Sequence, residues 1–202
     1  MVYLYSFPGL YWQPATLGKE SQVRDEEVFA EGIKKRNSDA WAELYDEYFP
    51  KIYRYIAVRV QNRADAEDLT EQVFLKALES SPSFRWRGAP VAAWLFRIAR
   101  NQVIDFRRMD KSKRMLPVDE SLVSDAIEPE EAAGRSSDIQ LVIEAVGQLT
   151  QAQRAVIELR FAGGLSIVET AKVVGKSQGA VKALQHSAMS ELRKTLAKWG
   201  QL

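Results

Sequence analysis

The chain has 202 residues, with 28 Lys and Arg against 27 Asp and Glu, and 46% of its residues are hydrophobic. This balance fits one globular domain or two small ones and excludes a wholly disordered chain. The absence of cysteine excludes disulfides, zinc ribbons, thiol catalysis and cysteine-bound iron–sulfur clusters. Because His186 is the one histidine, a metal site with several histidines is excluded too, and we expect neither metal nor cofactor.

The N-terminal segment, residues 1–25, is rich in aromatic residues and is broken by Pro8, Gly9 and Pro14. Its first lysine is Lys19, so it lacks the positive start of a secretory signal. No run in the chain approaches the roughly 20 apolar residues that cross a bilayer. We therefore expect a soluble protein of the cytoplasm without membrane insertion. Three interpretations of the segment stay open: a disordered tail, an interaction tail, or upstream sequence included by a misplaced start.

Residues 26–113 are predicted to form a helical domain, because apolar residues recur at steps of three and four without period-two alternation. Helices are expected over residues 28–36, from 38 to about 60, and over 64–79. Pro50 falls inside the second helix and should kink or split it. A loop over residues 80–89 and a fourth helix over 90–110 follow.

The third predicted helix is acidic on its exposed side. Its apolar side is expected to consist of Ala66, Leu69, Val73, Phe74, Ala77 and Leu78. On the other side Lys76 is opposed by Asp65, Glu67, Asp68, Glu71 and Glu79. A solvated or partner-binding face explains these acids better than a carboxylate metal site, because no Glu-x-x-His pairs accompany them.

The most polarised stretch, residues 85–114, holds nine Lys and Arg residues, opposed by Asp105 and Asp110. Helical spacing places on one side Arg97, Arg100, Asn101, Ile104, Arg107, Arg108 and Lys111. Phe84 and Trp86 lie in the preceding loop. Cations neutralise phosphates and aromatic rings stack on unpaired bases, so this stretch suits nucleic acid. The alternative is a solvated helix face with a buried tryptophan.

Residues 117–133 hold six acids and no Lys or Arg, include Pro117 and Pro129, and lack an amphipathic period. This pattern predicts a flexible acidic linker, taken as residues 114–136, between two helical domains. The second domain would occupy residues 137–202. The predicted fold class is therefore all-α, with two small helical domains.

Two capping boxes stand in the second domain, Thr150-x-x-Gln153 and Ser166-x-x-Glu169. They predict helices that begin near residues 151 and 167.

Residues 167–186 have the spacing of a helix-turn-helix motif. Ala171 is small where two helices cross, Gly175 favours a left-handed turn, and Ser177 can cap the next helix. The outward polar residues, able to contact phosphates and base edges in a major groove, are Lys176, Gln178, Lys182, Gln185 and His186. The alternative is an ordinary helical hairpin. A phosphate-binding loop ending at Ser177 is excluded, because that motif needs a glycine where Thr170 stands.

Three motifs follow one another along the chain: DAEDLTEQVFLKAL (65–78), WLFRIARNQVIDFRR (94–108) and LTQAQRAVIELRF (149–161). In this order, across an acidic linker, they resemble the sigma-70 family of RNA polymerase sigma factors in its extracytoplasmic function (ECF) group. The resemblance covers about residues 28–113, as region 2, and 139–199, as region 4. It implies a factor without catalytic residues that binds core RNA polymerase, recognises the minus-ten and minus-thirty-five promoter elements, and promotes DNA melting.

The resemblance also implies a role for each surface. The acidic helix would contact the clamp helices of the largest polymerase subunit through Asp65, Glu67, Asp68, Glu71 and Gln72. The loop and basic helix would bind the minus-ten element, with an extruded base held in the loop, through Phe84, Arg85, Trp86, Arg97, Arg100, Asn101, Arg107 and Arg108. The helix-turn-helix would bind the duplex minus-thirty-five element through Lys176, Ser177, Gln178, Lys182, Gln185 and His186.

Further partners implied by the resemblance are the polymerase flap region and an anti-sigma factor, and the linker would pass near the polymerase active-site channel. Two departures stand out. Glu71-Gln72 reverses an order that is frequent in the family, and many members carry arginines where this chain has Leu184, Ser187 and Met189.

Two other classes of function compete with this interpretation. A helix-turn-helix repressor or activator would need a dimerisation or effector domain. A nuclease or phosphotransferase would need a complete phosphate loop, a histidine pair, or a carboxylate–histidine constellation.

Overall fold

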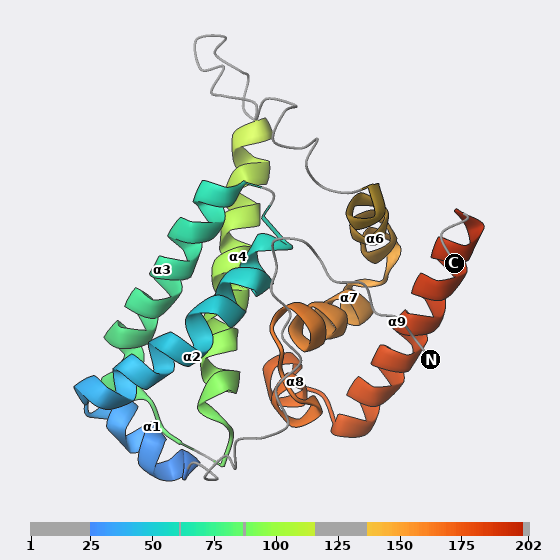
Figure 1. The fold of residues 1–202 in the computed structure, drawn as a ribbon. Helices are drawn as coiled ribbons and strands as arrows, with labels where there is room; N and C mark the ends of the chain where they lie inside the picture. Colours follow the sequence, from blue (N-terminus) through green and yellow to red (C-terminus); the bar gives the residue numbers. More distant parts are fainter. Residues whose placement is uncertain (1–24, 61, 87, 116–136, 200–202) are drawn as a thin grey trace, which may run out of the picture.

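A computed structural model describes residues 25–60, 62–86, 88–115 and 137–199 (Figure 1). The aromatic N-terminal segment up to residue 24 and the acidic stretch 116–136 lie outside the described residues, as do residues 200–202. The regular elements in the described part of the chain are all helical, which confirms the all-α prediction.

The first domain consists of α1 (Glu26–Lys34), α2 (Ser38–Ala57), α3 (Arg63–Ser80), the short 3-10 turn η1 (Ser81–Ser83) and α4 (Val91–Met115). The second consists of α6 (Ser137–Gln148), α7 (Gln151–Ile157), the π-helical turn η2 (Glu158–Ala162), α8 (Ile167–Val174) and α9 (Gln178–Lys198).

Side-chain caps fix where the helices of the first domain begin. Asp25 accepts a hydrogen bond from the backbone N–H of Glu27 at 3.0 Å, so α1 begins earlier than its apolar pattern suggests. Asn37 and Asn62 cap α2 and α3 in the same way. Each cap satisfies backbone donors that the first turn of a helix leaves unpaired.

Helix α2 continues through Pro50, so the alternative in which this proline splits the helix is wrong. Proline removes one backbone donor, which leaves a carbonyl one turn earlier without its helical partner. Pro50 lies on the exposed side of α2. Water can therefore satisfy the freed carbonyl, and the packing of the opposite side keeps the helix continuous.

The core of the first domain differs from the predicted apolar sides at two positions. Leu78 is 39% exposed rather than inward, while Thr70 takes a buried place in α3. Thr70 can be buried there, and its hydroxyl lies 2.7 Å from the backbone carbonyl of Ala66, one turn earlier. In α2 the ring of Tyr55 is fully buried and meets Phe96 of α4 edge to face, with ring centroids 5.4 Å apart.

The second domain has the predicted helix-turn-helix. Both capping boxes form, so α7 and α8 begin at the predicted residues. Gly175 ends α8 with a left-handed backbone (φ 69°, ψ 37°), and the Ser177 side chain caps α9. Ala171 and Val181 pack together with Val156 of α7, which holds the two helices of the motif against the rest of the domain.

The two domains also pack against each other. Figure 1 shows α1–α4 on one side and α6–α9 on the other, with α8 beside α4. Helix α8 contacts α4, and η2 contacts α2. Leu159, Leu165 and Val173 of the second domain belong to the same buried cluster as the core of the first domain. The two sequence domains therefore share a continuous apolar core.

The left-handed turn at Gly175 gives a direct test of the motif. In Gly175→Ala, the added Cβ meets no neighbouring atom, but the left-handed backbone costs an L-residue about 1–2 kcal/mol. We expect a lower urea midpoint by far-UV circular dichroism. Gly147→Ala is the control, because Gly147 lies in α6 with open space and no positive φ. Equal midpoints for the two variants would contradict the assigned turn.

Candidate nucleic-acid and polymerase interfaces

The acidic residues of α3 lie mostly on its solvent-exposed side. Glu67, Asp68 and Glu71 are exposed, whereas Asp65 is half-buried in the first turn. Glu67 pairs with Arg63 one turn earlier, at 2.8 Å. Leu75 and Leu78 are also exposed on this helix, at 60% and 39%. The face thus combines negative charge with two leucines that the sequence pattern did not single out.

Gln72, the last predicted member of this face, is exposed but has a neighbour in α4. Its side-chain carbonyl accepts a hydrogen bond from the Gln102 amide at 3.2 Å. The Gln102 carbonyl in turn accepts from the Lys76 ammonium group. Gln102 is buried, so this network satisfies a polar side chain in the core and fixes α3 against α4.

Helix α4 has one apolar side and one basic side, as predicted. Val91, Leu95, Phe96, Ala99 and Val103 are buried. On the other side, the predicted residues that are exposed are Arg97, Asn101, Arg107 and Arg108, and Arg100 is half-buried.

Two of these arginines already have protein partners. The Arg97 guanidinium donates to the backbone carbonyl of Lys172 in α8, at 2.6 Å. The Arg107 guanidinium donates to the carbonyl of Arg59, at 3.0 Å. The basic side of α4 is therefore partly engaged by the second domain and by the end of α2.

The loop before α4 separates its two predicted aromatic residues by environment. Phe84 is half-buried and packs against Trp94, with ring centroids 4.6 Å apart. Trp86 is 37% exposed and Arg85 is exposed. Together with α1, the loop lines a shallow hollow formed by Glu27, Ala30, Glu31, Lys34, Phe84, Arg85 and Trp86. Trp86 is thus the aromatic residue better placed to meet an unpaired base, and α1 contributes residues that the motifs did not indicate.

The helix-turn-helix presents its predicted polar residues at the start of α9. The exposed ones are Lys176, Ser177, Gln178, Lys182 and His186. Gln185 is half-buried and accepts a hydrogen bond from Arg160 at 3.0 Å, so its side chain has a structural partner. Lys182, Gln185 and His186 line a second hollow, together with Met189 and Arg193. This arrangement places cations and amides where a recognition helix meets a major groove.

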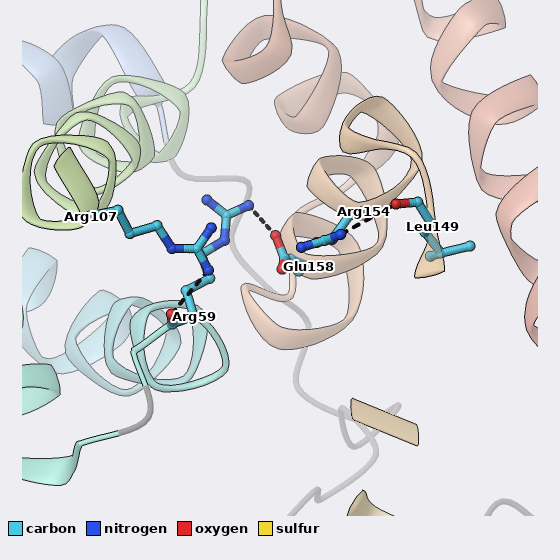
Figure 2. Close-up of polar contacts among 5 residues, drawn as sticks. All are labelled: Arg59, Arg107, Leu149, Arg154 and Glu158. Carbon is cyan, nitrogen blue, oxygen red and sulfur yellow. Dashed lines mark hydrogen bonds and ion pairs between the residues drawn. The ribbon is translucent and has the colours of Figure 1, made fainter. Parts of the chain in front are cut away.

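A buried charge cluster, which the sequence reading did not identify, lies between the domains. Figure 2 shows Glu158 between Arg59 and Arg107 on one side and Arg154 on the other. Arg59 and Glu158 form an ion pair across the domain boundary, with side chains only 7% and 8% exposed. Arg154 is held by the backbone carbonyl of Gly147 at 2.6 Å.

Burial sets the ionisation behaviour of this boundary. Desolvation raises the pKa of the Glu158 carboxyl, while Arg59 and, to a smaller extent, Arg107 and Arg154 act in the opposite direction. Burial also raises the pKa of Tyr55 to about 12, and its hydroxyl finds no hydrogen-bond partner among the described residues. The carboxylate of Glu158 can remain charged because arginines surround it.

The fold and these surfaces define an all-α, DNA-binding protein with a helix-turn-helix in its second domain. Sigma-70 region 2 matches residues 44–113, and sigma-70 region 4 matches residues 145–194. The chain therefore belongs to the sigma-70 family, in its ECF group, as the relatives below show. Members of this family are transcription initiation factors.

Named relatives agree with this assignment. The ECF sigma factor BldN of Streptomyces coelicolor is 39% identical over 161 residues, which cover 79% of this chain but 61% of BldN. SigX of Bacillus subtilis is 34% identical over 157 residues, which cover 75% of this chain and 80% of SigX. Among solved structures, RpoE of Bartonella quintana, in complex with the anti-sigma factor NepR, is 26% identical with a TM-score of 0.57, covering 77% of this chain and 96% of RpoE.

Two further findings concern the described residues. None of the helices there is both long enough and apolar enough to span a membrane. Nor does that part of the chain group three or more Asp, Glu or His side chains as a metal site would require.

The two aromatic residues of the loop should differ in what they stabilise. Phe84→Ala removes a ring packed on Trp94 and should cost roughly 1–2 kcal/mol of unfolding free energy. Trp86→Ala should cost less, because Trp86 lies at the surface. Thermal unfolding followed by circular dichroism measures both, with Arg85→Ala as the exposed neighbouring control. A larger loss for Trp86→Ala would show that its ring is a packing residue.

Proposed function

We propose that this sigma factor divides its work among three helices. Helix α3 docks on core RNA polymerase, α4 and the preceding loop hold the unpaired minus-ten strand, and α9 binds the minus-thirty-five duplex. The observation that carries the proposal is the separation of three polar surfaces: an acidic one on α3, a basic one on α4 and a polar one at the start of α9. Each surface belongs to a rigid helix whose other side is packed.

The residue assignments follow the chemistry of each surface. The exposed acids Glu67, Asp68 and Glu71 suit a basic polymerase surface, and the neighbouring Leu75 adds apolar area. Arg97, Arg100, Arg107 and Arg108 suit phosphates, while Asn101 and Trp86 suit an unpaired base.

Partners and place follow from the same proposal. We infer that the chain carries no catalytic step of its own and works in the cytoplasm, beside the chromosome. The flap region is proposed as a second polymerase contact. An anti-sigma factor is proposed as a regulator, since the related RpoE structure contains one.

Polymerase binding should depend on the charge of α3. Asp68→Lys places a cation in the proposed interface and should weaken binding to core polymerase about tenfold or more. Glu79→Lys is the matched control, because Glu79 is exposed on the same helix about 16 Å away along its axis. Fluorescence anisotropy of the labelled full chain measures both affinities. Equal affinities for the two variants would remove the docking assignment.

Melting and duplex binding should depend on different residues. Asn101→Ala removes a base contact worth ~1–3 kcal/mol if it is bidentate, and should impair opening of a duplex promoter. A pre-melted minus-ten bubble should partly restore the open complex. Lys182→Ala should weaken promoter binding on both templates, because it removes a phosphate or base-edge contact of α9.

Permanganate footprinting of holoenzyme with each variant, on duplex and pre-melted templates, separates the two roles. Circular dichroism of each variant checks folding, which both exposed positions should tolerate. Equal defects for Asn101→Ala on the two templates would argue against its part in strand opening.

A further inference from the structure

The second domain contacts the first through the π-helical turn η2 and through α8. In η2 the N–H of Gly163 bonds the carbonyl of Glu158, five residues earlier. Such turns are rare and interrupt the regular helical ladder. Here η2 carries Glu158 to Arg59, and the Ala162 carbonyl accepts a hydrogen bond from Arg54 at 3.3 Å. The turn therefore supplies two polar contacts to the end of α2.

Helix α8 covers part of α4. Its Lys172 carbonyl accepts the hydrogen bond from Arg97, and Val173 joins the apolar cluster that includes Phe96. Arg97 belongs to the surface proposed for the minus-ten strand, so the first helix of the helix-turn-helix occupies part of that surface.

Other functional surfaces stay open in this arrangement. Asn101 and Arg108 of α4 are exposed, as are Asp68 of α3 and Lys182 and His186 of α9. The contact between the domains therefore masks the start of the basic side of α4 without covering the acidic face or the recognition helix.

The charge cluster makes this contact specific. Glu158 compensates a guanidinium from the first domain and is itself buried, so each partner needs the other while the domains are together. Separation would let water solvate both groups. An apolar contact would tolerate sliding, whereas a buried ion pair fixes one alignment and is lost as soon as the domains part.

We propose that the free protein rests in a closed state, in which region 4 masks the start of α4 and the Arg59–Glu158 pair latches the two domains. The masking rests on the proposed function of α4, whereas the latch does not. Core polymerase would then have to open the molecule before both promoter elements can be bound. The closed state would thereby keep the free factor from holding single-stranded DNA.

Glu158→Gln is the decisive variant. It keeps the shape of the side chain but leaves Arg59, Arg107 and Arg154 around a neutral amide, so repulsion should open the contact. Glu191→Gln is the matched control, because Glu191 makes an exposed pair with Lys194 on α9, at 2.9 Å. Arg59→Gln, which disrupts the latch from the other domain, serves as the second variant.

Distances between the domains can be measured directly. The chain has no cysteine, so spin labels at Ala42→Cys in α2 and Ala197→Cys in α9, both exposed positions, are unique. Double electron–electron resonance of the full chain should give one narrow distance distribution. Glu158→Gln and Arg59→Gln should broaden it and shift it to longer distances, while Glu191→Gln leaves it unchanged. A broad distribution in the parent, or no change in either folded latch variant, overturns the latch.

Masking has its own readout. Binding of a fluorescein-labelled single-stranded oligodeoxynucleotide of mixed sequence, without polymerase, should strengthen in Glu158→Gln. If about one molecule in ten is open in the parent, full opening gives about a tenfold gain. Adding Arg97→Ala should reduce that gain. Wider distances without stronger binding would overturn the masking and the role of α4 while leaving the latch in place.

Discussion

The packing of α4 is the constraint on which the rest of the structure depends. Its apolar side meets α3 and α2, and Phe96 also lies in the cluster that continues into the second domain. Gly163 of the second domain approaches so closely that a Cβ built there would lie 2.7 Å from the Phe96 ring. One helix therefore closes the first domain, carries the basic surface and receives the second domain. A change on its buried side would disturb all three.

This arrangement explains why the polar surfaces are rigid. Each functional helix is held by packing on one side, so its exposed residues are fixed by the core rather than by one another. Gln102 adds a polar tie between α3 and α4, which couples the acidic face to the basic helix. The proposed polymerase contact and the proposed strand contact thus lie on neighbouring helices with a shared buried network. Force or charge applied to α3 is transmitted to α4 through side chains and not through a loop.

Much of this was predictable from local patterns. The capping boxes placed α7 and α8, and the glycine at 175 marked the turn, because these features depend on residues a few positions apart. The surfaces of α3 and α4 followed from helical periodicity. Tertiary features were harder. Leu78 obeys the period of α3 but lies at its exposed end, and the role of Phe84 as a packing residue depends on Trp94. The sequence hint for the latch was Glu158, a lone acid after the apolar residues 155–157.

The latch could not have been derived from that hint, because its partner lies 99 positions earlier in the chain. Arg59 stands after the end of α2, where a cation is ordinarily solvated. Only the packing of η2 on α2 turns both residues into buried groups. A buried pair of this kind contributes little net stability, since desolvation offsets much of the attraction, but it penalises every misaligned contact. The apolar cluster can therefore supply the attraction between the domains while the ion pair selects one geometry. That division of labour suits a contact that must be specific when closed and still open when a larger partner binds.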